Sequence, residues 1–478
     1  MFVNKSVIGK LIGISLVFVL LLMGRSSETS LAADTEATSI YLPLIVRNFP
    51  PPPTVFGVEV HSFTNQDVIR LAVDARVSWV RIAAFDWSKI EPNAPVGNVH
   101  TYDWSKALES SLENIGRNHL RPIATVKMAP SWAQKYAGVS CGPIAAEKFT
   151  DFAAFLQAAV QRYSQPPYNV HHWELGNEPD VSRELVPADY PFGCWGEKGQ
   201  TYYGGEYYAE MLKVAYPAIK AADPTAKVSI GGLLMDCDPN DPQCTDPAAS
   251  KFLEGILRNQ GAGYFDMLSF HAYPAFYTPA NPFYSDLHHP KWDLRGGILD
   301  GKLDYIHEVM NTYGVSKPIS LNEGGLMCVE PSQYCPPSVG IPYFLDAQAS
   351  YVVWYYVRAL AGGVENAIWY TFEGSGWRSV GMIGDDPSQP RDAYKVFKFI
   401  TSELADVTYT GRVNTGSALH GYAFSKTGKV IWVLWSPDGQ AHNFTLPAGY
   451  DQILDRFGNP VTPGNGVISI NSPVYIEF

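Results

Sequence analysis

Two glutamates, Glu178 and Glu323, each follow an apolar run of the kind that forms a buried strand. Glu178 lies in the motif WELGNEP at 173–179, and Glu323 lies in the motif LNEGG at 321–325. Two carboxyl groups at the ends of separate barrel strands are the minimum equipment for cleaving a glycosidic bond. A single Glu at a strand end is more often a solvated or helix-capping carboxylate, so this chemistry depends on the elements that carry the pair.

The chain from residue 56 alternates between strand-like and helix-like segments, with helical patterns such as 65–75, 145–163, 207–222, 303–313 and 347–361. Eight such alternations before residue 400 predict the α/β class and a (β/α)8 TIM barrel. Several strand runs are apolar without alternation, as a parallel sheet covered on both faces requires. The expected strands are 56–61, 79–84, 122–127, 172–175, 228–233, 267–271, 319–322 and 367–371.

A doubly wound open sheet is the structural alternative to the barrel. Such a sheet carries a glycine-rich phosphate turn after its first strand, and this chain has Val60-His61-Ser62-Phe63 there. The barrel at 56–400 is therefore the favoured interpretation.

Residues 401–478 have a different pattern of short β-type runs at 430–435, 443–446, 467–470 and 474–478. Turn-forming sequences such as 436–439 and 457–460 separate these runs. The segment predicts a C-terminal antiparallel β-sandwich domain.

The first 32 residues are typical of a signal peptide. Lys5 and Lys10 precede an apolar run at 11–23, and Ser30-Leu31-Ala32 offers a small-residue cleavage site. An uncleaved membrane anchor is the alternative. In both cases the folded part is expected to be secreted or extracytoplasmic.

Residues 33–55 follow as a Pro-rich linker with an unbroken proline run at 50–53. The apolar stretch 40–46 within it has no firm interpretation from the sequence.

Six cysteines suit an oxidising compartment and allow fifteen pairings. Spacing suggests two short loops, Cys237 with Cys244 and Cys328 with Cys335, which leaves Cys141 for Cys194. Zinc binding by the cysteines is the alternative interpretation, but no CxxC or HxxxH spacing supports it. We therefore expect three disulfides, no metal and no organic cofactor.

The composition fits a folded globular protein, because 46% of the 478 residues are hydrophobic and 17% are charged. The net charge of −12 argues against nucleic acid and against an anionic membrane surface as a partner. The 12 Trp, 28 Tyr and 23 Phe supply rings for the core and for stacking on sugars. The oligomeric state is left open by the sequence.

Polar and aromatic residues gather at the ends of seven of the expected strands. Barrel enzymes place their sites at the C-terminal ends of the strands, so one face of the barrel would hold all of these side chains. The candidate site residues are His61, Arg81, Trp87, Trp132, Asn177, Glu178, His271, Tyr273, Glu323 and Trp369.

Three motifs, WELGNEP at 173–179, SFHAYP at 269–274 and LNEGG at 321–325, resemble those of the clan A glycoside hydrolases. The resemblance is greatest to family 39, and families 5, 51 and 79 are also similar. It covers the barrel and extends to the C-terminal sandwich. The chain departs from the family 39 pattern at Gly176, where a bulky residue is usual, and at Gly324, where an aromatic residue is usual.

The resemblance implies a role for most of the candidate residues. Glu178 would be the general acid/base, and Glu323 the nucleophile that forms a glycosyl-enzyme intermediate. Asn177 would bind the sugar 2-hydroxyl, and Arg81 would keep Glu323 ionised. His271 and Tyr273 would orient the pair, Trp369 would form the floor of the −1 subsite, and the remaining candidates are expected to bind substrate: His61, Trp87 and Trp132.

The expected function is that of a secreted retaining β-glycoside hydrolase, which acts on an oligo- or polysaccharide by double displacement. A non-catalytic carbohydrate-binding barrel and a transglycosylase are the alternatives. The motifs do not specify the sugar, the linkage or exo against endo action, because many substrates occur within the clan. All six cysteines fall in loops on the expected catalytic face, so the disulfides are expected to brace the rim of the cleft.

Overall fold

The computed structural model describes residues 52–182, 192–197, 199–329 and 341–478. The expected signal peptide, most of the linker and the stretch 40–46 lie outside these residues and stay predictions. Within the described residues, none of the helices combines the length and apolarity needed to cross a membrane. Thr54 and Val55, the last residues of the predicted linker, already contact the barrel through hydrogen bonds with Ser78 and Ala367.

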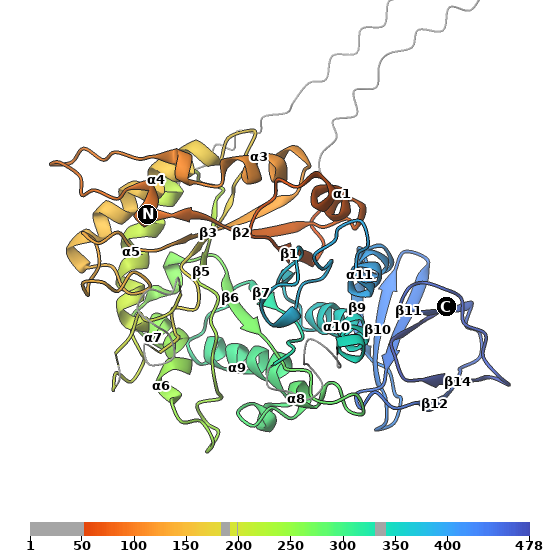
Figure 1. Cartoon of the computed structure of the whole chain (residues 1–478). Helices are drawn as coiled ribbons and strands as arrows, with labels where there is room; N and C mark the ends of the chain where they lie inside the picture. Colours follow the sequence, from red (N-terminus) through yellow and green to blue (C-terminus); the bar gives the residue numbers. More distant parts are fainter. Residues whose placement is uncertain (1–51, 183–191, 198, 330–340) are drawn as a thin grey trace, which may run out of the picture. The chain divides into compact units, whose positions relative to one another are not determined.

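Eight parallel strands form the barrel in the order β5-β4-β3-β2-β1-β8-β7-β6 (Figure 1). Parallel bridges from Ser229 to Met267 and from Leu233 to Phe270 join the two ends of this order. The expected (β/α)8 barrel is confirmed. Its strands are β1 (Phe56–Glu59), β2 (Trp79–Asp86), β3 (Arg121–Lys127), β4 (His172–Leu175), β5 (Lys227–Ile230), β6 (Leu268–Ala272), β7 (Ile319–Gly324) and β8 (Asn366–Trp369).

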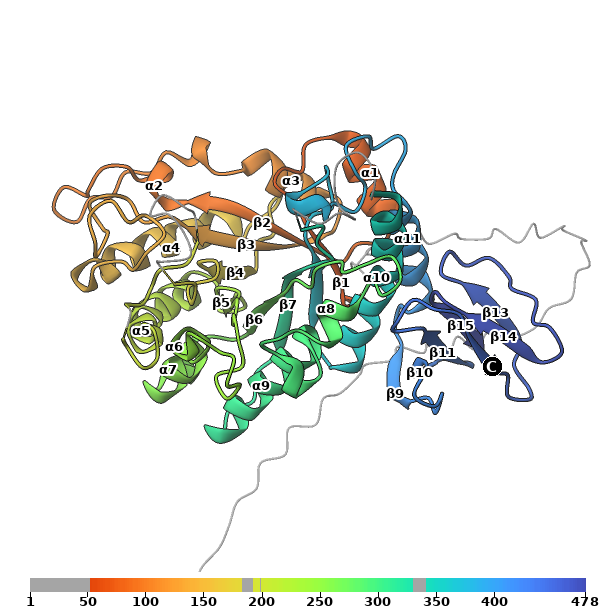
Figure 2. The same ribbon diagram turned by 60° about the horizontal axis from the view of Figure 1, so that its bottom comes forward.

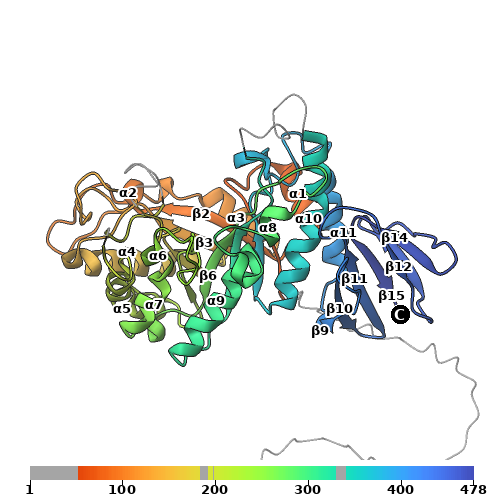
Figure 3. The same cartoon turned by 90° about the horizontal axis from the view of Figure 1, so that it is seen from below.

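Helices follow the strands and cover the outside of the barrel (Figures 2 and 3). They are α1 (Gln66–Asp74), α2 (Trp87–Ile90), α3 (Glu109–Arg117), α4 (Phe149–Tyr163), α5 (Gly205–Ala222), α6 (Pro247–Ser250), α7 (Phe252–Arg258), α8 (Tyr284–Leu287), α9 (Ile298–Thr312), α10 (Ile341–Ala361) and α11 (Asp392–Glu403). Short 3-10 turns lie at Trp104–Lys106, Ala146–Lys148, Gly261–Tyr264, Asp293–Arg295 and Trp377–Ser379.

The strands are buried on both faces, which explains their unbroken apolar runs. Strand β1 has four buried residues in a row, and β6 has five. Near their C-terminal ends, the pairing of β6 with β7 shifts register after Phe270, and that of β7 with β8 shifts after Leu321. Such irregularities redirect side chains at a barrel rim, and here they precede His271 and Glu323.

The C-terminal domain is built from antiparallel strands: β9 (Thr408–Arg412), β10 (His420–Lys426), β11 (Lys429–Trp435), β12 (His442–Thr445), β13 (Gln452–Asp455), β14 (Val467–Ile470) and β15 (Val474–Glu477). Five of them pair in the order β13-β15-β11-β10-β9, and β12 pairs with β14. The expected β-sandwich is confirmed. The predicted domain boundary at 400/401 falls inside α11, because that helix continues to Glu403.

The main hydrophobic core extends from the barrel into the sandwich, which also has a smaller cluster of its own, and Pro51–Phe478 is a single compact unit. Trp354 of α10 lies with its ring centroid 5.3 Å from that of Trp435 on β11, and both side chains are fully buried. Arg456 of the sandwich donates to the Ser350 hydroxyl of α10 at 2.5 Å and pairs with Asp346. The sandwich thus completes the burial of α10.

Substitution of Trp435 by alanine should weaken both domains together. The ring stacks on Tyr422 and contacts Trp354, and loss of a buried Trp side chain costs about 3–5 kcal/mol. We expect one unfolding transition at lower urea concentration, measured by tryptophan fluorescence and by circular dichroism. The control is Val430→Ala on the same strand, whose side chain is 40% exposed and should matter little. Unfolding of the sandwich alone, with the barrel unaffected, would contradict the shared core.

Candidate active site

A cavity of about 810 Å³ opens at the C-terminal ends of the barrel strands. Residues of β1, β2, β3 and β7 line it directly, and residues that follow β4, β5, β6 and β8 complete it. The predicted residues among those that line it are His61, Arg81, Asn177, Glu178, Tyr273 and Glu323. The structure therefore brings both glutamates to one cavity.

Glu178 follows β4 in a turn whose backbone is unusual. Its own φ is +45°, and Gly176 has a φ of +90°. The Glu178 N–H donates to the Gly232 carbonyl at 2.9 Å, which ties this turn to the end of β5. A Cβ on Gly232 would lie 2.1 Å from the His271 ring, so the missing side chain leaves room for that histidine. The turn holds Glu178 at the cavity with its side chain almost buried.

Glu323 has a strong donor on each carboxylate oxygen. The Arg81 guanidinium donates to Oε2 at 2.6 Å, and the Tyr273 hydroxyl donates to Oε1 at 2.6 Å. Burial alone would raise the pKa of this carboxyl, but the charges of His271 and Arg81 outweigh burial and hold the pKa below its ordinary value. The carboxyl group of Glu323 is thus kept ionised.

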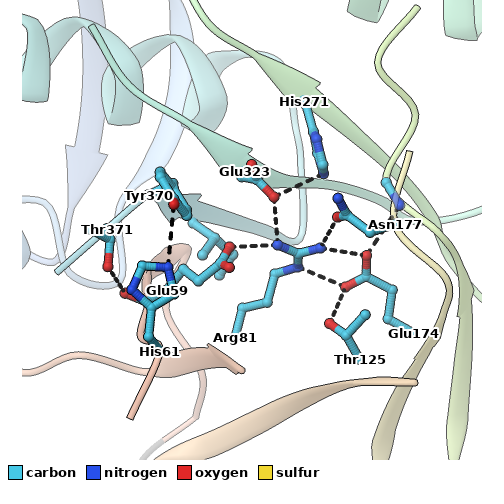
Figure 4. Close-up of polar contacts among 12 residues, drawn as sticks. Glu59, His61, Arg81, Thr125, Glu174, Asn177, His271, Glu323, Tyr370 and Thr371 are labelled. Atoms are coloured by element: carbon cyan, nitrogen blue, oxygen red, sulfur yellow. Dashed lines mark hydrogen bonds and ion pairs between the residues drawn. The ribbon is translucent and has the colours of Figure 1, made fainter. Parts of the chain in front are cut away.

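His271 lies between the two glutamates. Its Nδ1 is 2.7 Å from Glu178 Oε1, and its Nε2 is 3.5 Å from Glu323 Oε2 (Figure 4 shows the second contact). Burial works against the imidazolium, yet the carboxylates of Glu323 and Glu178 raise the pKa of this ring above its usual value. One residue therefore fixes the relative position of both carboxyl groups.

Arg81 is the centre of the polar network in Figure 4. Its Nε and Nη2 donate to the two oxygens of Glu174, each at 2.8 Å, in a bidentate pair. Nη2 also donates to Asn177 Oδ1 at 2.6 Å, and Nη1 donates to Glu59 and Glu323. The Arg81 side chain is 3% exposed, so three carboxyl groups surround one buried cation.

A metal ion has one candidate position within the described residues. Ligand atoms of Glu178, His271 and Glu323 lie within 4.8 Å of one another. The same side chains already bind each other, Arg81 and Tyr273, and an arginine in the cluster supplies the positive charge that a cation would bring. The arrangement is therefore suited to acid/base and nucleophilic chemistry; the absence of a cofactor stays a prediction.

Comparison with known proteins gives matches among solved structures alone, since no family model and no curated protein matches the chain. A family 39 glycoside hydrolase from Bacteroides cellulosilyticus WH2 matches with a TM-score of 0.65 and 18% identity, over 89% of this chain and 80% of that one. The chain has the fold of the clan A glycoside hydrolases. The resemblance noted in the motifs is confirmed at the level of the fold.

Two further structures give the same result for this glycoside hydrolase fold. A GH39 β-xylosidase from Caulobacter crescentus matches with a TM-score of 0.54 and 14% identity, over 90% of this chain and 97% of that one. An α-L-arabinofuranosidase from Thermotoga maritima matches with a TM-score of 0.53 and 13% identity, over 89% and 96%. These similarities cover the barrel together with the sandwich.

Three predicted tryptophans lie away from the cavity of this glycoside hydrolase fold. Trp369 is fully buried, donates its indole N–H to the Val380 carbonyl and lies behind Gly325. It has no surface for a sugar, which corrects its expected place as the subsite floor. Trp87 is 1% exposed and bonds to Glu91, and Trp132 bonds to the Glu91 carbonyl. These rings pack edge-to-face and support the rim.

Several lining residues were not predicted as site residues from the sequence, namely Glu59, Lys127, Lys302 and Tyr370. Glu59 is the last residue of β1 and lies two residues before His61. A charged residue between the apolar Val58 and Val60 was the signal in the sequence that could have identified it. Glu174 was missed as a partner of Arg81, although it stands in WELGNEP. A charged residue inside a fully buried strand requires a buried counter-charge, and Arg81 supplies one.

Disulfides link loops at the rim, as expected. Cys141 after β3 bonds to Cys194 after β4, and Cys237 bonds to Cys244 after β5. The described residues include no free cysteine, and Cys328 is disulfide-bonded. Its expected partner, Cys335, lies outside the described residues.

The two departures from the family 39 pattern have physical reasons in this chain. Gly176 has a φ of +90°, a conformation that disfavours any residue with a Cβ. A Cβ on Gly324 would lie 2.6 Å from the Ala272 carbonyl oxygen and 2.8 Å from the Tyr355 ring. Tyr355 thus occupies the space into which a side chain at 324 would extend.

Replacement of Gly324 by alanine should disturb Glu323, its neighbour on β7. The Ala272 oxygen belongs to the backbone of β6 and yields little, so we expect a loss of about 1–3 kcal/mol in the free energy of unfolding. Urea denaturation measures this loss, with Gly263→Ala as the matched control, because a Cβ at 263 meets no atom within 4 Å. Equal stability of the two variants would contradict the close contact.

Proposed function

We propose that the chain is a secreted retaining β-glycoside hydrolase that cleaves an oligo- or polysaccharide by double displacement. One observation carries the proposal: carboxylate oxygens of Glu178 and Glu323 lie within 4.8 Å of each other in a cavity at the barrel rim. Retaining enzymes hold the two carboxyl groups about 5–5.5 Å apart, whereas inverting enzymes leave about 6.5–9.5 Å for a water molecule. The close approach favours retention.

In the first step Glu323 attacks the anomeric carbon, and the bond to the leaving oxygen breaks. Glu178 donates its proton to that oxygen, so the leaving group departs as a neutral alcohol. Arg81 and Tyr273 keep the nucleophile ionised and fix its orientation. The product of this step is a glycosyl ester of Glu323.

In the second step Glu178, now a carboxylate, takes a proton from a water molecule that attacks the anomeric carbon. The ester bond to Glu323 breaks and the sugar leaves with its original configuration. His271 contacts Glu178 at 2.7 Å and is suited to hold the carboxyl in one position while its charge changes.

Asn177 is suited to bind the 2-hydroxyl of the sugar. Its Oδ1 accepts from Arg81 at 2.6 Å, which directs the remaining N–H groups of the amide to other acceptors. A hydrogen bond to the 2-hydroxyl strengthens as charge develops on the ring in the transition state. Tyr370 and the half-exposed Trp377 supply further polar and aromatic surface in the cavity.

Secretion forms part of the proposal. Disulfides persist in oxidising environments outside the cytoplasm, and two are present at the rim. The expected N-terminal signal peptide agrees with this location. Carbohydrate is the proposed partner of the cavity.

The function is tested with a panel of aryl glycosides and of plant and microbial polysaccharides, followed by NMR detection of the first-formed product anomer. We expect hydrolysis of at least one β-glycoside with retention. Added sugar acceptors in the same assay distinguish hydrolysis from transglycosylation. Absence of turnover across the panel, with binding of a polysaccharide preserved, would favour a non-catalytic carbohydrate-binding barrel instead.

Alanine variants of the two glutamates should differ in a diagnostic way. Glu178→Ala should lower turnover by about 10²–10⁴-fold for substrates with poor leaving groups. It should keep activity on activated aryl glycosides, and added azide should restore turnover and give a glycosyl azide. Glu323→Ala should lose activity on every substrate, because no intermediate forms. Near-normal turnover by Glu323→Ala would contradict the nucleophile assignment.

A further inference from the structure

One nitrogen of Arg81 serves two carboxylates. Nη1 donates to Glu59 at 2.5 Å and to Glu323 at 2.6 Å (Figure 4). Glu59 comes from β1 and Glu323 from β7, so the two acids approach the guanidinium from different strands. Both side chains line the cavity. A change of charge on one of these acids therefore changes the electrostatic environment of the other.

The other carboxylate of the cluster is already fully engaged. Glu174 is completely buried and accepts from Arg81 twice, from the Gly232 N–H at 3.1 Å and from the Thr125 hydroxyl at 3.3 Å. These four bonds make Glu174 the permanent counter-charge of Arg81. Glu59, in contrast, bonds to Arg81 alone among the described side chains, and it faces the cavity.

The proton in this cluster resides on Glu59. Burial, together with the charges of Glu323 and Glu174, raises the pKa of Glu59 to about 7 against the pull of Arg81, while the pKa of Glu323 is lowered. Below neutral pH one acid on Nη1 is thus protonated and the other is ionised. The titratable and charged groups that face Glu59 are Arg81, Lys127, Glu174, Tyr273, Glu323, Tyr355 and Tyr370.

We propose that Glu59 is a positioning residue of the reaction, which exchanges its proton with solvent as the nucleophile gains and loses its sugar and so keeps Arg81 paired through the cycle. The inference rests on the proposed retaining mechanism. It adds a third carboxyl group to the two that carry out the chemistry.

The exchange follows from the charges. When Glu323 becomes an ester, it loses its negative charge. Nη1 of Arg81 then no longer donates to a carboxylate of Glu323. Glu59 then gives its proton to water in the cavity and becomes the carboxylate partner of Nη1. When water releases the sugar, Glu323 regains its charge and Glu59 takes a proton back from solvent. One proton leaves and one returns in each turnover, so the balance is closed.

In Glu59→Gln the side chain is neutral at every pH. It therefore resembles the protonated Glu59 of the free enzyme, but it cannot become the carboxylate that the intermediate requires. With an activated aryl glycoside from the panel, we expect kcat/KM, which reports formation of the intermediate, to change less than threefold. We expect kcat, limited by release of the sugar, to fall at least tenfold, with a burst of aryl alcohol equal to the enzyme concentration. Glu59→Asp keeps the carboxyl group and should recover part of kcat.

The matched control is Glu403→Gln. Glu403 is also a partly buried carboxyl with a raised pKa, caused first by burial, but it pairs with Lys429 at the barrel–sandwich junction. Its substitution should leave the ratio of kcat to kcat/KM unchanged. If Glu59→Gln lowers both parameters equally, or raises KM alone, Glu59 contributes ordinary substrate binding and the proposal is overturned.

A second measurement needs no substrate and so stands even if the panel finds none. The pKa of Glu59 is raised in the folded protein, so the folded state holds its proton more tightly than the unfolded state. Stability from this group is complete at acidic pH and is lost as pH rises from about 4.5 towards 7. The Tm of wild type minus that of Glu59→Gln should therefore fall between pH 5 and pH 8. A constant difference would overturn the placement of the proton.

Discussion

A buried guanidinium surrounded by three carboxyl groups is the interaction on which the site depends. Arg81 enters from β2 and binds side chains from β1, β4 and β7, so a single residue joins half of the barrel at its rim. A buried charge is costly without partners, and a buried carboxylate equally so. Each member of the cluster therefore requires the others, and the register of four strands must be correct for any of them to be satisfied.

The same constraint separates the roles of the acids. Glu174 accepts hydrogen bonds from Arg81, Thr125 and the Gly232 N–H, and it does not line the cavity. Glu323 receives a donor on each oxygen and stays ionised, while Glu178 lies apart from Arg81 and is held by His271. Residues of one chemical type thus acquire different protonation and different access from the bonds around them, which is how two carboxyl groups can divide the work of acid and nucleophile.

Much of the fold was predictable from the sequence, because buried parallel strands and amphipathic helices have strong patterns. All eight barrel strands were found, with ends that differ by a few residues. The predicted helical segments correspond to α1, α4, α5, α9 and α10, and none of them covers α2, α3, α6, α7, α8 or α11. The two cavity glutamates, Glu178 and Glu323, and their neighbours were predicted from the strands and strand-end motifs that carry them: Arg81, Asn177, His271 and Tyr273. Glu59 was not predicted, since its proposed role depends on the approach of β1 to β7, which are far apart in sequence.

Trp369 was misplaced because a strand's last residue can point behind the rim as readily as towards it, and the sequence does not determine the direction of that side chain.

The packing of α10 on the sandwich has a consequence for the history of the chain. Many barrel enzymes gain or lose accessory modules, since a module joined by a linker can be exchanged without damage to its neighbour. Here the sandwich covers an apolar helix of the barrel itself through Trp354 and Trp435. Deletion of the sandwich would expose that surface and favour aggregation. Barrel and sandwich are therefore expected to be inherited as one unit, and recombination in related chains should fall before the barrel or after the sandwich, not between them.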